Sequence, residues 1–337
     1  MIGIKRNLRA PCYKSGPTST AAEETMADNM FRQDPADALE WRSLGSETGE
    51  KPPDALRAFR DITAVVSHLS GDTLAVEVAA SLARRARGRL DVVQVLAMPV
   101  TAADAWALIP DPARVERHAR LRREAAERAG EFSRMLAGRD VQGEVRTLEA
   151  LHHAPGTVAA ASARHADLVV MGRPTGSASQ ARAAHRYFAA LLLESGRPVL
   201  VVPEGTTASF PPGAISVAWA ETAEAARALH DAMPLLEGAE TVDIVIVDVT
   251  SNESDPLLAS AANVMAHLRA HGARTHLVTC SSRGSSVGHT LLRQATRRHA
   301  QLLVAGGYGH GRLREWALGG TTRELFIESP IPVLFSH

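Results

Sequence analysis

The sequence has very little cysteine and no long apolar run. Cys12 and Cys280 are the only cysteines among 337 residues. Two cysteines so far apart make no disulfide framework, which fits a reducing compartment. No apolar stretch approaches the roughly 20 residues that a membrane-spanning helix requires. Residues 10–29 also lack the apolar segment of a signal peptide. We therefore expect a soluble cytoplasmic protein without a membrane partner.

An excess of charge of either sign is absent as well. Lys and Arg number 37, Asp and Glu also number 37, and aromatic residues make up only 4% of the chain. No basic tract is interleaved with aromatic residues, so nothing indicates a nucleic-acid partner or an anionic membrane. Hydrophobic residues make up 45%, which is ample for a core, and the length suggests about two domains.

The first 58 residues are poor in branched apolar side chains. They mix Ser, Thr, Glu, Asp, Gly and Pro, and residues 45–54 read as a linker. We expect a disordered N-terminal extension over residues 1–58. An alternative is that translation begins at Met26 or Met30, in which case most of this segment is not made.

Strand-like and helix-like runs alternate over residues 59–204, which we expect to form one domain. The expected strands are 62–66, 90–96, 141–148, 167–171 and 197–203, and the expected helices are 73–87, 110–136, 156–165 and 185–195. This alternation is typical of an open parallel sheet with helices on both faces. The sequence therefore predicts an α/β fold.

The same order of elements recurs over residues 214–337, the second expected domain. Its expected strands are 214–219, 242–249, 275–279, 302–305 and 331–335, with helices at 222–236, 257–271, 287–299 and 322–327. Gly306 follows Gly172 by 134 residues, and Pro332 follows Pro198 by the same number. The chain therefore contains an internal repeat. The first copy carries about 19 extra residues, which we place between residues 98 and 138.

A glycine-rich stretch follows the fourth strand of the second copy. Gly306, Gly309 and Gly319 are separated by two and nine residues. Thr321 and Glu324 form a capping-box signal for the helix expected at 322–327. A helix N-terminus facing a glycine loop favours anion binding, because its amide groups are unpaired and the helix dipole attracts negative charge.

The chain resembles a tandem universal stress protein. The resemblance rests on the element order, on the Gly306, Gly309 and Gly319 spacing, and on the paired endings RPVLVVP and IPVLFSH. It implies two tandem flavodoxin-like (Rossmann-like) domains, each with a five-stranded parallel sheet. It also implies self-association through the fifth strands, 197–203 and 331–337, as an intramolecular pseudo-dimer that could pair again as a homodimer.

The resemblance further implies that the second domain binds ATP, which Mg²⁺ could accompany. It places these residues at the nucleotide: Gly306, Gly309, His310, Gly311, Arg312, Gly319, Gly320, Thr321, Thr322, Trp219, Ala220 and Val249. Two positions depart from the family pattern. Gly320 stands where a hydroxyl is usual, so Thr321 either supplies that hydroxyl or only caps the helix. Ala220 stands where an aspartate is usual, and Glu221 is the nearest substitute.

The first copy has lost the glycine loop. Thr175 replaces its second glycine, and His185 stands at the position of Gly319. We expect this domain to bind no nucleotide and to serve as a scaffold or partner surface. The alternative is a different anion site at Arg173 and His185.

Catalytic signatures are missing. There is no nucleophile elbow and no Walker lysine. His267 and His271 have the spacing of a metal site but lack its glutamate, and we interpret them as surface residues. We therefore expect a stress-response protein that binds an adenine nucleotide and is not an enzyme. Two alternatives stay open: a nucleotide-free interaction or dimerisation module, and slow ATP hydrolysis.

Overall fold

The computed structural model describes residues 55–68, 71–98, 111–173, 177–207, 210–249, 255–308 and 320–337, which belong to one compact unit, residues 53–337. Most of the expected N-terminal extension lies outside these ranges. Its last four residues depart from the expectation, because they form the short 3-10 helix η1 (Ala55–Ala58). Leu56 is only 8% exposed and packs into the core, which fixes this segment.

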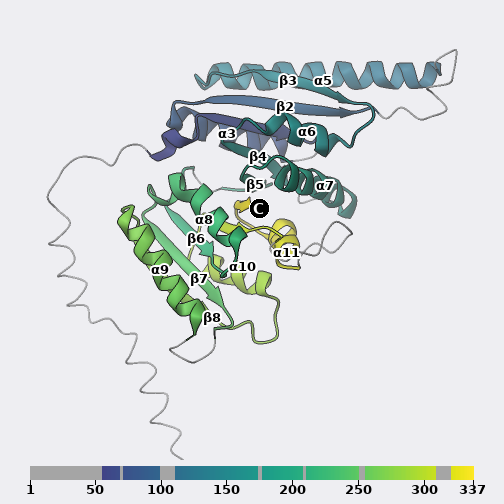
Figure 1. Ribbon diagram of the computed structural model, residues 1–337. Coiled ribbons are helices and arrows are strands. Elements are labelled where there is room, and N and C mark those ends of the chain that lie inside the picture. The colour runs from purple at the N-terminus through teal and green to yellow at the C-terminus, as the bar shows by residue number, and fades with distance from the viewer. Residues whose placement is uncertain are drawn as a thin grey trace, which may run out of the picture. The chain divides into compact units, whose positions relative to one another are not determined.

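The N-terminal domain alternates strands and helices, as its sequence pattern predicts (Figure 1). After η1 it contains β1 (Asp61–Val66), α3 (Asp72–Ala86), β2 (Arg89–Ala97), α5 (Pro112–Gly138), β3 (Val145–Ala150), α6 (Pro155–Ala163), β4 (Leu168–Arg173), α7 (Ala178–Glu194) and β5 (Val199–Pro203).

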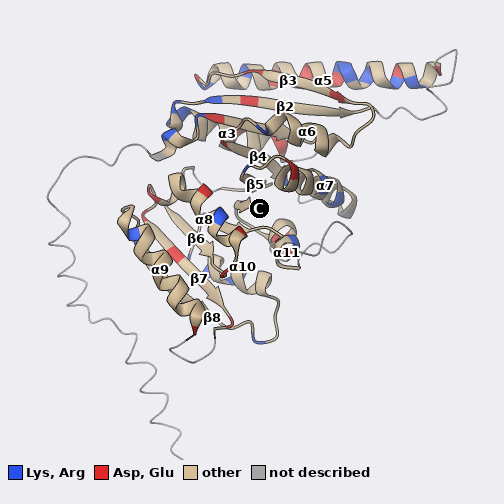
Figure 2. Cartoon of the chain, in the orientation of Figure 1, with Lys and Arg blue, Asp and Glu red and all other residues tan. Residues whose placement is uncertain are grey.

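The C-terminal domain repeats this order. It contains β6 (Ala214–Ala218), α8 (Ala223–Leu236), β7 (Thr241–Val247), α9 (Pro256–Ala270), β8 (Thr275–Cys280), α10 (Val287–Arg297), β9 (Leu302–Gly306), α11 (Gly320–Glu328) and β10 (Val333–Ser336). The sequence predicts that the extra residues of the first domain lie between residues 98 and 138. Helix α5 lies in this region and has 27 residues, whereas its counterpart α9 has 15. Basic and acidic positions are interspersed along α5 (Figure 2).

The strands form one ten-stranded sheet in the order β3-β2-β1-β4-β5-β10-β9-β6-β7-β8. Neighbouring strands within each domain are parallel. The junction is antiparallel, with Val333 opposite Val201 and Phe335 opposite Val199. The α/β fold with two tandem domains is thus confirmed. Each domain has the Rossmann-like strand order 3-2-1-4-5, in which the direction of winding reverses beside the first strand.

Two apolar layers cover the two faces of the sheet. One layer joins the sheet to α3, α5, α8 and α9. The other joins it to α6, α7, α10 and α11. Phe188 of α7 and Phe326 of α11 stack at 4.5 Å between ring centroids, and Phe335 of β10 lies 4.9 Å from Phe188. The second layer is therefore continuous across the junction of the two domains.

Two boundaries differ from the sequence prediction in a way that affects function. Helix α7 begins at Ala178, seven residues before its expected start, and Ser177 caps it by accepting a hydrogen bond from the Gln180 N–H. Helix α11 begins at Gly320, two residues before its expected start. Among the described helices, none combines the length and apolar character that crossing a bilayer requires.

Candidate functional site

The candidate site lies at the carboxyl ends of β6, β7 and β9 in the C-terminal domain. These parallel strands are neighbours in the order β9-β6-β7, so their ends meet at one edge of the sheet. The chain passes from β6 to β7 on one side and returns to β9 on the other. Ligand crevices in open α/β sheets form at this kind of reversal. Ala220, Val249 and the segment after Gly306 all belong to this edge.

Gly306 is required by packing inside the protein. A Cβ atom at this position would lie 2.7 Å from the backbone nitrogen of Ala225, in the first turn of α8. Gly172 is in the same situation, since its Cβ would lie 2.7 Å from the carbonyl carbon of Gly71, beside α3. Both copies keep this glycine because a helix N-terminus approaches the end of the fourth strand. The first glycine of the spacing therefore has a structural role in both domains, with or without a ligand.

Tyr308 and Thr322 join the end of β9 to the start of α11. Tyr308 has a left-handed backbone, with φ of 60°, and its N–H donates to Thr322 Oγ1 at 3.2 Å. Thr322 is only 5% exposed. The Thr322 hydroxyl is thus engaged inside the protein. This link places the N-terminus of α11 at the carboxyl edge of the sheet, as an anion site requires.

Thr321 does not cap α11, which corrects one of the two roles expected for it. The helix already includes Gly320, so Thr321 lies within its first turn. Among the described residues, no atom lies within 4 Å of a Cβ built on Gly320, so they leave the space around it open. The remaining loop residues predicted at the nucleotide, namely Gly309, His310, Gly311, Arg312 and Gly319, lie outside the described residues.

The residues expected near the base and sugar have different surroundings in the structure. The Trp219 indole N–H donates to Ser260 Oγ of α9 at 3.2 Å, and the ring packs against the core, so Trp219 is a structural residue. Ala220 is exposed, as is Glu221 beside it. Val249 is partly buried against the same core as Trp219. Ala220 and Val249 thus lie at the sheet edge and offer no side-chain hydrogen bond.

Arg173 and His185 serve the junction between the domains and do not form the alternative anion site. Arg173 is 7% exposed and donates to the carbonyl oxygens of Ile327 and Ser329, at 2.6 and 2.5 Å. It therefore neutralises the C-terminal end of α11, where the helix dipole is negative. His185 packs edge-on against Phe326 at 5.3 Å. Both side chains are committed to contacts with the second domain.

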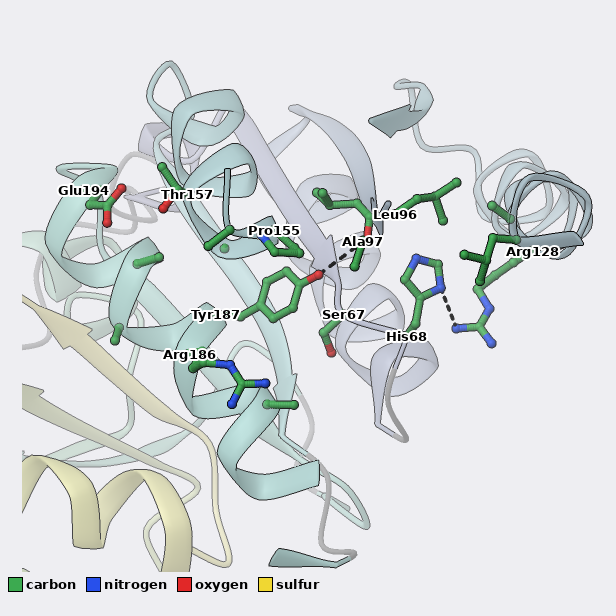
Figure 3. Close-up of a pocket in the computed structure, with 18 of the residues that line it drawn as sticks. Ser67, His68, Leu96, Ala97, Arg128, Pro155, Thr157, Arg186, Tyr187 and Glu194 are labelled. Carbon is green, nitrogen blue, oxygen red and sulfur yellow. Dashed lines mark hydrogen bonds between the residues drawn. The ribbon is translucent and has the colours of Figure 1, made fainter. Parts of the chain in front are cut away.

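A cavity that the sequence reasoning missed lies in the N-terminal domain. It has a volume of about 760 Å³ and is lined by Ser67 and His68, which follow β1, and by residues of β2, α5, α6 and α7 (Figure 3). It stands at the carboxyl ends of β1 and β2, which is the same place in this copy as the candidate site in the other. The available signal was the set of small residues Ala183, Ala189 and Ala190, but a helical pattern alone does not indicate that they line a cavity.

Metal binding finds no support in the described part of the chain, where no three His, Cys, Asp or Glu side chains are placed to hold an ion. His271 lies 3.2 Å from a Glu237 carboxylate oxygen, and the His267 ring is 4.7 Å from the His271 ring. This pair therefore belongs to the surface of α9 and its end.

Comparison with known families decides the relationship. Residues 58–203 and 174–337 each match the model of the universal stress protein family. The chain belongs to this family. With two matches along its length it is a tandem universal stress protein. A comparison with curated proteins gave no match.

Similar solved structures cover both domains of this universal stress protein. One is a universal stress protein from Archaeoglobus fulgidus, with 16% identity and a TM-score of 0.63, covering 83% of this chain and 97% of that chain. Another is a putative universal stress protein from Pseudomonas aeruginosa, with 15% identity and a TM-score of 0.54, covering 84% and 94%. At such identities the likeness shows the fold alone.

Proposed function

We propose that this universal stress protein is a stress-response protein whose C-terminal domain binds an adenine nucleotide, ATP, which Mg²⁺ accompanies. The observation that carries the proposal is the placement of the α11 N-terminus at the carboxyl end of β9, held by the Tyr308–Thr322 hydrogen bond. The phosphates would lie against the first amide groups of α11 and the glycine-rich segment before it. The family relationship supports this assignment of the loop.

Physical chemistry favours an anion at this place. The first amide groups of a helix have no partners within the helix, and the dipole adds about half a positive charge. The open space around Gly320 leaves room for a ligand to approach these amides. A side chain at this position would narrow that approach.

The affinity should be modest. Ala220 provides no carboxylate for a sugar hydroxyl, and the missing hydrogen bond is worth about 1 kcal/mol. Glu221 is exposed beside it and would have to reach the sugar from solvent. We therefore expect binding that needs up to millimolar nucleotide.

Calorimetry with ATP and Mg²⁺ tests the proposal. The Gly320→Val variant should lose the binding heat, since a branched side chain would narrow the approach to the α11 amides. The matched control is Gly130→Val, in the exposed middle of α5, where a Cβ meets no atom within 4 Å. This control should bind as the unmodified protein does. Binding that is absent from the unmodified protein, or equal in both variants, contradicts the proposal.

A nucleotide-free interaction module is the second candidate. Two observations favour it, because Trp219 is held by Ser260 and Ala220 carries no polar group. The two candidates differ in a structure determined with ATP present. An empty, closed crevice at the end of β9 would support the interaction module.

We infer no robust catalysis for this protein. In the sequence only His310 and Glu315, both in the glycine-rich segment, favour slow ATP hydrolysis, and they lie outside the described residues. ADP should not accumulate when the purified protein is incubated with ATP over hours. Its accumulation would assign a hydrolytic function instead.

A further inference from the structure

The cavity of the N-terminal domain differs in chemistry from the candidate nucleotide site. Its wall includes Ala183, Arg186 and Tyr187 of α7. The 134-residue offset places Arg186 at the position of Gly320 and Tyr187 at that of Thr321. Helix α7 already spans these positions, so it presents side chains where the other copy begins a helix. A wall of side chains offers no row of free amides, and a polyphosphate is therefore a poor fit.

Most of the cavity wall is apolar. Leu96 and Ala97 come from β2, Leu121 from α5 and Pro155 from α6. Leu193 on the rim is 49% exposed, although it is a large apolar side chain. Ligand pockets of about 300–1,000 Å³ with mainly apolar walls bind compact organic molecules by enclosing an apolar body. The volume of about 760 Å³ lies within this range.

His68 and Arg128 form a polar end of the cavity (Figure 3). The Arg128 guanidinium lies 3.4 Å from His68 Nδ1. An arginine can only donate, so Nδ1 accepts and Nε2 carries the proton of a neutral imidazole. Burial, and next the Arg128 charge, lower the pKa of His68, while Glu124 opposes them. His68 Nε2 is buried and has no hydrogen-bond partner in the described part of the chain.

The charged side chains that line the cavity are two arginines and two glutamates, which differ in position and in ion pairing. Arg128 of α5 and Arg186 of α7 flank Ser67 and His68 in Figure 3. Neither guanidinium forms an ion pair with a described carboxylate. Of the two lining acids, Glu124 lies 3.9 Å from Arg120, and Glu194 stands near Thr157, on the far side of Pro155 from His68. Glu124 is thus the lining acid whose charge reaches His68, and no described carboxylate forms an ion pair with the two arginines at this end.

We propose that this cavity binds a compact organic carboxylate, with its apolar body against the α7 alanines and Leu96 and its carboxylate at Arg128 and His68. An arginine matches a carboxylate because its planar fork offers parallel N–H donors. The site is separate from the proposed nucleotide site, which lies in the other domain.

Three probes with one apolar body and different head groups test the proposal: 4-phenylbutyrate, 4-phenylbutanol and 4-phenylbutylamine. Calorimetry on the full chain should show the carboxylate binding at least about tenfold more tightly than the alcohol, and the amine more weakly still. Equal affinities, a preference for the amine, or no carboxylate binding at about 10 mM would overturn the proposal.

Variants assign the binding to the cavity. Arg128→Met should weaken 4-phenylbutyrate about tenfold and leave 4-phenylbutanol unchanged, whereas Arg134→Met, on the same helix but outside the lining, should change neither. Ala183→Phe should fill the cavity and abolish binding, and Ala181→Phe, which is also partly buried in α7 but outside the lining, should not. Circular dichroism checks that each variant folds.

ATP serves as the competing ligand. It should not displace 4-phenylbutyrate, and Ala183→Phe should leave any ATP binding heat unchanged. Displacement by ATP, or loss of ATP binding in Ala183→Phe, would show that the cavity is a nucleotide site and overturn the proposal. Failure of ATP to bind anywhere would contradict the proposed function of the C-terminal domain without affecting this inference.

Discussion

The two domains share strand order and core but differ in the segments after their fourth strands. After β4 the chain enters the 17-residue helix α7, whereas the helix after β9, α11, has only nine residues and begins at Gly320. Arg173 reaches across to the end of α11, and the equivalent position in the second domain is Gly307. A Cβ on Gly307 would meet Leu192 of the first domain at 2.6 Å. At this pair of equivalent positions the first domain thus supplies a side chain to the junction, and the second has a glycine that leaves room for Leu192.

The position of Thr322, just after the glycine loop of the second domain, has a packing role in the first domain. Phe188 takes the position of Thr322 and fills the junction between the domains. Thr322 instead holds the start of the C-terminal loop through Tyr308. At these equivalent positions the first domain thus has a ring that packs at the junction, and the second has the hydroxyl that accepts from Tyr308.

The largest expected effect comes from the aromatic cluster at the junction. Phe188→Ala should lower the free energy of unfolding by about 3–5 kcal/mol, because it leaves a cavity among fully buried rings. Denaturant titration measures this loss. The control is Leu193→Ala, a half-exposed residue of the same helix, which should cost less than about 1 kcal/mol. Similar losses in both variants would mean that Phe188 does not unite the domains.

Gly306→Ala should cost about 3 kcal/mol, because its Cβ would collide with the backbone of α8. Gly172→Ala should cost a similar amount, although its domain has lost the loop. Gly320→Ala, where the space is open, should change stability by less than about 0.5 kcal/mol. If Gly172→Ala leaves stability unchanged, the packing role proposed for this glycine in both domains is wrong. The glycine would then be needed only where a ligand binds.

Arg173→Met should lower the free energy of unfolding by about 2 kcal/mol, because two buried carbonyl oxygens lose a charged donor. Hydrogen exchange should also quicken at the C-terminal end of α11. Arg182→Met, an exposed position of α7, serves as the control and should have little effect. Unchanged exchange at α11 would argue against the role of Arg173 at the junction.

Thr322→Val keeps the shape of the side chain but removes the acceptor for the Tyr308 N–H. It should cost about 1–2 kcal/mol and weaken any ATP binding, since the start of the loop is no longer held. Thr321→Val, at the partly exposed neighbouring position, should cost less. The reverse order would assign the structural hydroxyl to Thr321.

The smallest expected effect is a pH dependence at His185. Burial, and next the Arg323 charge, lower the pKa of His185 below its ordinary value near 6.5. As the pH falls below about 6.5, the unfolded chain gains a proton that the folded protein does not bind, so stability decreases until the folded-state pKa is reached. His185→Gln should therefore lose less stability between pH 7 and 5.5 than the unmodified protein. Denaturant titration at the two pH values measures this difference.

Much of the fold could be predicted from the sequence, because burial imposes a pattern of apolar residues on each helix and strand. The short apolar runs of β1, β4, β6 and β9 are buried strands, and their repetition at a constant offset reveals the duplicated domain. The predicted boundaries of the helices agree less well with the structure. Helix α7 starts seven residues early because Ser177 caps it, and the capping signal of Ser177 was not recognised in the sequence.

The candidate site could be placed by sequence but not interpreted by it. The glycine spacing correctly indicates the carboxyl edge of the sheet. The glycine at position 306, however, is required because α8, which is remote in sequence, packs against it. Trp219 could not be separated from a base-stacking residue until Ser260 was seen beside its indole. Close approaches between distant segments leave no local pattern, so such roles are invisible in one sequence.

The sequence by itself determined the tandem α/β architecture and the loss of one glycine loop, since hydrophobic periodicity and residue spacing are local properties of the chain. Only the tertiary structure decided the roles of Arg173 and His185 at the junction and disclosed the cavity between α5, α6 and α7. Both depend on which side chains meet across the sheet. That is set by the packing of helices against strands far apart in the sequence.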